Sequence, residues 1–278
     1  MLTPPHCDVS LSETRWVQAV IVDESTKEGA VVDPVEPQKV LEAANSHGVN
    51  NLKLVLTTHH HGDHAGGNEK IKQLVLGMKV YGGSMDNIKG CTDKVENGDK
   101  MSLGADINIL CLHTPCHTKG HISYCVTGKE EEVLRKEYNK LILKAMPKFI
   151  AGCGKFFEGT AEQIYQSLCV TLGSLPKPTR VYCGHEYAVR NLLFALTIEP
   201  DNLRIQQKLT WAKNQQQAGQ STIPSTIEEE METNPFMRVN LPEIQGASLP
   251  VEALRELRKL KDKWKGVMEL TNYCILHV

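Results

Sequence analysis

The pattern of apolar and polar positions divides the chain into a strand-rich part and a helical part. Short apolar runs bounded by turn residues predict strands, and spacing near 3.6 residues predicts helices. The predicted strands cover 16–22, 29–34, 52–56, 79–83, 107–114, 122–126 and 180–183. The predicted helices cover 37–44, 162–175, 191–196, 205–216 and 250–264, with another after the turn at 65–70. No strand is expected after residue 190. This order favours a layered α/β sandwich over residues 1–188 with a helical domain over 189–278.

Composition narrows the class of protein. The 278 residues are 41% hydrophobic and 23% charged, as in soluble globular proteins. A net charge of −2 predicts no nucleic-acid partner, and no apolar run reaches the roughly 20 residues of a membrane span. The N-terminus resembles neither a secretory signal nor a transit peptide, and the nine cysteines are scattered. We therefore expect a reduced cytoplasmic chain, and nothing in the sequence requires more than a monomer.

The most informative segment holds four histidines and one aspartate within residues 59–64. Imidazoles are costly to bury together without partners, and a metal ion removes this conflict. His59 and His61 lie two apart on an extended segment, so they share one side and can chelate one ion. Asp63 and His64 follow after a bend and can face a neighbouring ion, while His60 is expected to point away.

Two further histidines, His117 and His185, also follow predicted strands and lie beside glycine or proline. Six ligands from three strand ends exceed the needs of one tetrahedral ion, which favours two ions that share a water for hydrolysis. Zinc, iron and manganese all suit such donors. We expect His113 and His121 to have structural roles.

Five segments carry a resemblance to a known family. The chain resembles glyoxalase II, the hydroxyacylglutathione hydrolase of the metallo-β-lactamase superfamily, and is most similar to its plant-type cytosolic form. The resemblance runs from about residue 20 to 265 and is carried by segments 56–68, 114–121, 151–160, 182–187 and 234–238.

The resemblance implies a fold, a reaction and a site. The fold is an αββα sandwich over 1–188 with a helical glutathione-binding domain over 189–278, whose tail is nonstandard from about residue 266. The reaction is hydrolysis of S-D-lactoylglutathione to D-lactate and glutathione by a metal-bound hydroxide, the second step of methylglyoxal detoxification. One zinc ion would be held by His59, His61 and His117, and the other by Asp63, His64 and His185. Asp63 is also assigned a catalytic role. Glutathione contacts map to Lys155, Tyr187, Arg258 and Lys261.

The chain departs from the family pattern at several points. Met146 stands where the family has an aspartate that bridges both ions, and the stretch 130–143 is helix-like where a strand is expected. A thioether is a poor ligand for zinc, so we expect weaker binding of at least one ion and reduced activity. Gly62 replaces a tryptophan and Phe157 replaces a tyrosine. The altered segments 1–19, 130–149 and 266–278 are block changes of the kind that a variant transcript produces.

Two alternatives stay open. The first is a catalytically impaired homologue that binds metal or glutathione, which Met146 favours. The second is a persulfide dioxygenase of the same superfamily with one iron. The helical C-terminal part, with Asn234-Pro235-Phe236-Met237-Arg238, argues against the second.

Overall fold

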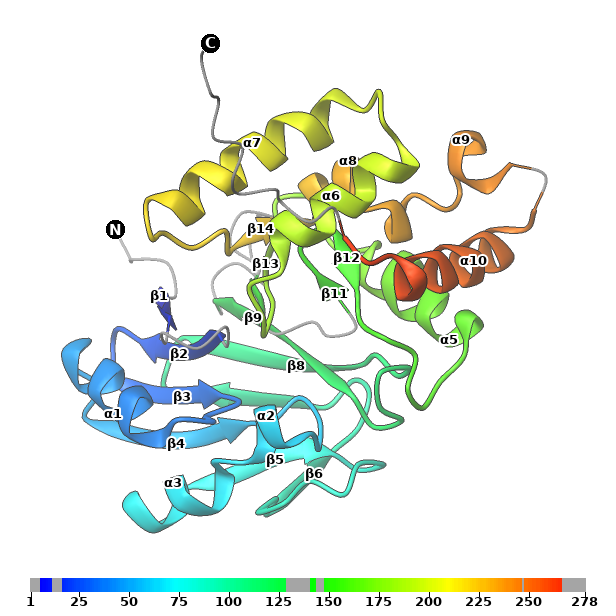
Figure 1. The fold of residues 1–278 in the computed structure, drawn as a ribbon. Coiled ribbons are helices and arrows are strands. Elements are labelled where there is room, and N and C mark those ends of the chain that lie inside the picture. Colours follow the sequence, from blue (N-terminus) through cyan, green and yellow to red (C-terminus); the bar gives the residue numbers. More distant parts are fainter. Residues whose placement is uncertain (1–5, 12–16, 129–140, 144–147, 247, 267–278) are drawn as a thin grey trace.

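Two six-stranded sheets face one another in the computed structural model (Figure 1), which describes residues 6–11, 17–128, 141–143, 148–246 and 248–266. In spatial order, the first sheet holds β1 (His6–Leu11), β2 (Val17–Asp23), β3 (Glu28–Val32), β4 (Asn51–Leu56), β5 (Lys79–Gly83) and β6 (Asp93–Val95). The second holds β14 (Ser225–Thr226), β13 (Arg180–Tyr182), β10 (Leu141–Leu143), β9 (Ile122–Gly128), β8 (Ile107–His113) and β7 (Lys100–Leu103). A two-stranded sheet joins β11 (Lys148–Phe149) and β12 (Gly152–Cys153).

Helices cover the outer faces of both sheets (Figure 1). The N-terminal helices are α1 (Pro37–Ser46), α2 (Gly62–Ala65) and α3 (Asn68–Leu74). The helices of the second half are α5 (Ala161–Tyr165), the π-helix η1 (Gln166–Leu172), α6 (Ala188–Ile198), α7 (Leu203–Gln217), α8 (Ile227–Thr233), the 3-10 helix η2 (Pro235–Met237), α9 (Pro242–Gln245) and α10 (Pro250–Lys263).

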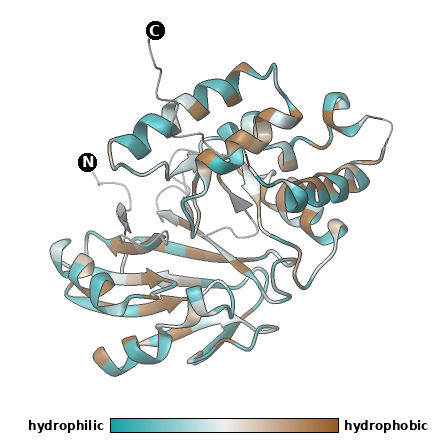
Figure 2. Ribbon diagram, viewed as in Figure 1, coloured by the Kyte–Doolittle hydropathy of each residue, from teal (hydrophilic) through white to brown (hydrophobic). Residues whose placement is uncertain are grey.

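The alternation of side chains along the strands explains the layers. In β2, Ala19 and Ile21 face the second sheet, where they join a core with Ile109 and Tyr124. The intervening Val20 and Val22 belong to a separate core under α1 and α3. A third core packs the outer face of the second sheet against α5, η1 and α10. In Figure 2 the central strands carry brown, hydrophobic segments and the helices mix teal and brown, as expected for buried strands and half-exposed helices. The predicted αββα sandwich with C-terminal helices is therefore confirmed.

The direction of the strands determines where the histidines lie. Strand β4 runs parallel to β3 and to β5, so its carboxyl end shares one edge of the sheet with theirs. The histidine segment follows β4 at this edge. In open α/β sheets, binding sites form outside the carboxyl ends of the strands.

Three expectations about elements were wrong in part. Ser225 and Thr226 form a strand, although none was expected after residue 190; a two-residue edge strand has no periodicity and is recognisable only from its pairing with β13. The predicted helix 162–175 begins at Ala161 and becomes a π-helix from Gln166. Residues 141–143, which were expected to be helix-like, pair with β9 and β13.

The remaining expectations have different outcomes. The other predicted strands and helices are present within a few residues of their expected bounds. Residues 129–140 and 144–147, with Met146, lie outside the described residues. The domain division at 188/189 stays a prediction. In the described part of the chain, no helix combines the length and apolarity needed to cross a membrane.

Candidate metal and substrate site

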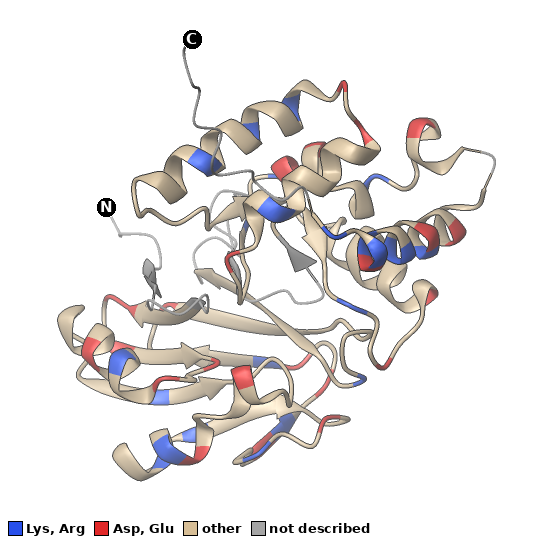
Figure 3. Cartoon of the chain, in the orientation of Figure 1, with Lys and Arg blue, Asp and Glu red and all other residues tan. Residues whose placement is uncertain are grey.

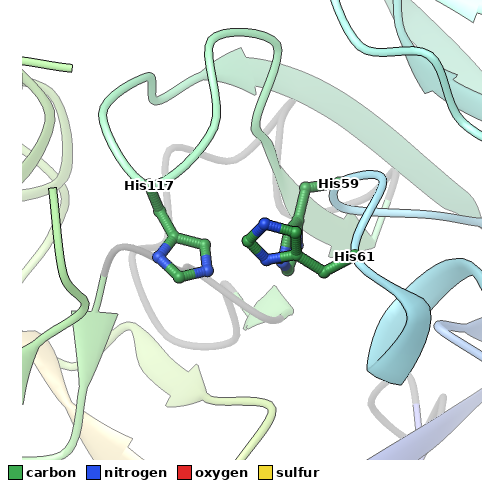
Figure 4. A group of neighbouring side chains, drawn as sticks. All are labelled: His59, His61 and His117. Atoms are coloured by element: carbon green, nitrogen blue, oxygen red, sulfur yellow. The ribbon is translucent and has the colours of Figure 1, made fainter. Parts of the chain in front are cut away.

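Two groups of three side chains meet where strands of both sheets end. His59 and His61 follow β4, and His117 comes from the loop between β8 and β9; Figure 4 shows their rings converging. One nitrogen from each of the three rings lies within 4.8 Å of the others. His59 Nε2 lies 3.1 Å from His61 Nδ1. These are the three residues that the sequence predicted to act together.

The second group contains Asp63, His64 and His185. Their ligand atoms also lie within 4.8 Å of one another. His64 Nε2 lies 3.3 Å from His185 Nε2, and Asp63 Oδ2 lies 3.4 Å from His185 Nε2. The ring centroids of His59 and His64 are 4.1 Å apart, so the two groups adjoin. The structure thus brings all six predicted ligands together, and their occupation by metal stays a prediction.

Hydrogen bonds orient three of the imidazoles toward the interior of the site. His64 Nδ1 donates to Asp33 Oδ2 at 2.7 Å, and His117 Nδ1 donates to the carbonyl oxygen of Lys155 at 3.1 Å. The Thr58 hydroxyl donates to Asp33, so its oxygen accepts from His59 Nδ1 at 3.0 Å. Each Nδ1 therefore carries the proton, and each Nε2 lone pair remains for a ligand. This arrangement fits a metal cation, because ligating histidines bond their second nitrogen in this way.

Burial favours the uncharged form of these rings. It lowers the pKa of His59 well below its usual range and that of His117 to about 4. Burial and the neighbouring His60 also lower the pKa of His61. The hydrogen bond with His185 is the largest cause that lowers the pKa of Asp63 to about 2. Neutral imidazoles beside an ionised carboxylate form the donor set that zinc, iron or manganese would use.

Three further histidines near the site contact other protein groups, and the roles expected of them stay predictions. His60 turns toward Asp86 and Glu158 and is 30% exposed. His121 is fully buried beneath the site, with Nδ1 3.0 Å from Thr114 Oγ1. His113 Nε2 contacts the carbonyl oxygen of Lys119 at 2.8 Å.

A pocket of about 880 Å³ opens beside the two groups. Its lining includes ligands from both groups, and all four residues that the resemblance assigned to glutathione, namely Lys155, Tyr187, Arg258 and Lys261. Helix α10 carries both signs of charge (Figure 3), and its residues Arg258, Lys261 and Asp262 line one side of the pocket. Phe157 is 60% exposed in this pocket, with its ring centroid 5.1 Å from that of His117.

The four residues assigned to glutathione differ in how far their side chains are engaged by other protein groups. Arg258 donates to the Cys153 carbonyl at 3.0 Å and to Asp262 at 2.8 Å, so much of its hydrogen-bonding capacity is used within the protein. Lys261 Nζ is buried 4.4 Å from the centroid of Phe194, and burial lowers its pKa to about 7. Tyr187 stacks on His185 at 5.2 Å.

Arg190 is a pocket residue that the sequence analysis missed. It is exposed, and its side chain makes no hydrogen bond or ion pair within the described part of the chain. Lys155 Nζ is likewise unpaired among the described residues and lies 6.0 Å from the ring centroid of Phe157. Arg190 lies three residues after the recognised segment 182–187, so its position in the sequence gave only a weak signal.

Comparisons with known proteins identify relatives of this chain and a shared fold. Residues 186–264 match a family model described as "Hydroxyacylglutathione hydrolase C-terminus". Residues 16–75 match one described as "Metallo-beta-lactamase superfamily". The chain is 65% identical over 250 residues to the cytoplasmic hydroxyacylglutathione hydrolase of Arabidopsis thaliana, covering 89% of this chain and 94% of that protein. It is 43% identical over 264 residues to a hydroxyacylglutathione hydrolase-like protein of Gallus gallus, covering 94% of this chain and 90% of the relative.

A solved structure shares the architecture. The crystal structure of ETHE1 from Myxococcus xanthus aligns with a TM-score of 0.64 and covers 94% of this chain and 92% of its own, at 22% identity. At that identity the likeness shows the fold alone. The family follows from the higher identities: the chain belongs to the hydroxyacylglutathione hydrolases of the metallo-beta-lactamase superfamily.

Proposed function

We propose that the chain hydrolyses S-D-lactoylglutathione to D-lactate and glutathione, as a thioester hydrolase of the glyoxalase II type. The observation that carries this proposal is the juxtaposition of two three-ligand groups with a pocket that cations line. The family membership supports the same substrate class.

The six ligands would hold two ions, with His59, His61 and His117 in one group and Asp63, His64 and His185 in the other. Bound divalent ions supply an activated water and polarise the thioester carbonyl. We also assign Asp63 a catalytic role, in which its carboxylate would help to orient the water that attacks the carbonyl. We propose zinc as the metal, while iron and manganese suit the same donors.

The pocket would orient the glutathione part of the substrate. Glutathione carries two carboxylates, and Arg and Lys side chains are their natural partners. Lys155 and Arg190 are exposed lining cations whose side chains make no hydrogen bond or ion pair in the described residues, whereas Arg258 is paired and Lys261 is buried, so we assign the carboxylates first to Lys155 and Arg190. Arg258 would then position the wall of the pocket through its bonds to Cys153 and Asp262. The exposed Phe157 ring would lie beside the acyl group, next to His61 and His117.

Loss of thioester absorbance tests the proposal. S-D-lactoylglutathione would be supplied to protein loaded with zinc, and to His59→Ala protein as a control. We expect absorbance to fall with the wild-type chain alone. An equal, slow rate with both proteins would contradict the proposal.

Two other functions make different predictions. An impaired homologue, which Met146 favours, would bind metal or glutathione but leave the thioester intact. A persulfide dioxygenase would consume oxygen with glutathione persulfide. The match of residues 186–264 to the hydrolase C-terminal family favours the hydrolase over the dioxygenase.

The setting of the reaction is also a proposal. A small-molecule thioester is the expected partner, and the net charge of −2 supports the absence of a nucleic-acid partner. We propose a monomer that acts without a membrane partner. We place it in the cytoplasm because the Arabidopsis relative is named a cytoplasmic enzyme.

A further inference from the structure

A buried carboxylate outside the six ligands joins the two loops that supply the three-histidine group. Asp86 lies in the turn after β5, and its side chain is 1% exposed. Its Oδ2 accepts the backbone N–H of His60 at 3.2 Å and the hydroxyl of Thr118 at 2.8 Å. Its Oδ1 accepts the backbone N–H of Gly120 at 2.7 Å. His60 lies between two ligands, and Thr118 directly follows the third.

The turn that carries Asp86 and the loop that carries Gly120 lie in close contact. A Cβ atom at Gly120 would lie 2.4 Å from the backbone nitrogen of Asp86 and 2.7 Å from its Oδ1. No side chain can therefore occupy this position unless the turn moves. The absence of one lets the Gly120 amide reach the carboxylate.

The imidazole of His60 adds a second connection. Its Nδ1 lies 3.3 Å from Asp86 Oδ2, and its Nε2 lies 3.5 Å from Glu158 Oε1. Glu158 in turn accepts the Lys119 backbone N–H at 2.9 Å. Both carboxylates thus contact His60 on one side and the loop of His117 on the other.

These contacts answer whether His60, Asp86 and Glu158 could instead hold a third ion. Their ligand atoms lie within 4.8 Å of one another. However, both oxygens of Asp86 already accept N–H or O–H donors from the protein, which point their hydrogens at the place a cation would need. The geometry fits a hydrogen-bonded connection between loops.

We propose that Asp86 is a positioning residue that holds His59, His61 and His117 at the separation needed for one metal ion. The inference rests on the proposed metal-dependent function, and it goes beyond that function by assigning metal affinity to a residue that touches no ligand ring of the site. An asparagine at this position would turn a donor toward at least one of the three groups that now donate to Asp86. Loss of a group that hydrogen-bonds a ligating side chain lowers metal affinity by about 10- to 100-fold, and because Asp86 acts through the loops we expect the lower end of this range.

The experiment compares zinc affinity in the full-length wild-type, Asp86→Asn and Asp23→Asn proteins, by competition with a chromophoric chelator. Asp23 is a matched control, because it is also a buried aspartate that accepts loop amides. Asp23 is the last residue of β2 and lies opposite Glu28, the first residue of β3. This end of the first sheet is the one farthest from the histidines, which follow the other end of β4. We expect the zinc dissociation constant to rise at least tenfold in Asp86→Asn alone. The visible spectrum of cobalt-loaded protein, which reports the geometry around the ion, should change in the same variant only.

A milder variant keeps the test decisive if Asp86→Asn does not fold. Thr118→Val removes one contact to Asp86 and conserves shape, and we expect the zinc dissociation constant to rise several-fold. Zinc affinity within twofold of wild type in either folded variant would overturn the inference and leave the proposed function intact. A wild-type chain that takes up no zinc would overturn both.

Discussion

The Nδ1 atom of His64 lies 2.7 Å from Oδ2 of Asp33, and both side chains are fully buried. The same carboxylate accepts the backbone N–H and the hydroxyl of Thr58, whose oxygen faces His59. Asp33 therefore fixes the tautomer of one histidine in each group. This pairing orients both Nε2 lone pairs toward the site, as the outer contacts of metal-binding histidines do.

Replacing Asp33 with asparagine should weaken metal binding in both groups. An amide nitrogen facing His64 would favour the tautomer with the proton on Nε2, which removes the lone pair that a metal needs. We expect metal affinity to fall by about 10- to 100-fold. Elemental analysis after dialysis against a chelator measures this loss. Unchanged metal content in a folded Asp33→Asn protein would contradict the assignment.

Restoring a carboxylate at position 146 should raise metal content and activity. Two neighbouring cations repel one another unless anionic charge lies between them, and Met146 supplies none. We expect the purified wild type to hold fewer than two ions per chain, and Met146→Asp to approach two with faster thioester hydrolysis. Met146→Leu, which stays apolar, serves as the control and should resemble wild type. Two ions per chain in the wild-type protein would refute this expectation.

Removing the guanidinium of Arg190 should weaken substrate binding without changing the metal site. An exposed pair of opposite charges contributes up to about 1 kcal/mol, so we expect KM for S-D-lactoylglutathione to rise by about fivefold in Arg190→Gln with kcat conserved. Arg180→Gln changes the same charge on β13, where the side chain is exposed and does not line the pocket, and should leave KM unchanged. Equal KM values for the two variants would remove Arg190 from the binding site.

Replacing Lys261 with methionine should raise thermal stability in a manner that depends on pH. Burial, with smaller contributions from the nearby Arg258 and Arg190, lowers the pKa of this amine from 10.5 to about 7, and Cys153 partly opposes the shift. Between these two values the unfolded chain binds a proton that the folded chain has released, so the contribution of Lys261 to stability improves as pH rises. Below pH 7 the folded protein carries the buried cation at its full cost.

We therefore expect the melting temperature of Lys261→Met to exceed that of wild type at pH 6, and the difference to shrink toward pH 10. Lys259→Met is the control, because that side chain is exposed and paired with Glu256 on the same helix. A difference that stays constant from pH 6 to 10 would show that the amine is not titrating as its burial predicts. The gain in stability should accompany a higher KM, since the cation that burial penalises lines the substrate pocket.

Sequence patterns predicted most of the strands and helices, because apolar side chains recur at the period of the element that buries them. Apolar alternation located β2, β3 and β4, and helical spacing located α1, α7 and α10. The pattern failed where an element depends on a distant partner. Ser225 and Thr226 form a strand only because β13 lies beside them, and η1 departs from the α-helical pattern that its spacing predicts.

The sequence by itself determined which side chains could act as metal ligands, because the ability to bind a metal belongs to each imidazole and carboxylate. His59, His61, Asp63 and His64 also lie within six residues, so they stay close together in any fold. Only the tertiary structure decided how they are held. It brings His185 to His64 across 121 residues, and it places Asp86 between two ligand loops. It also engages Arg258 with Asp262 and leaves Arg190 open to the pocket. The physical reason is that ligand identity belongs to single side chains, whereas orientation and burial depend on neighbours that the folded chain brings together.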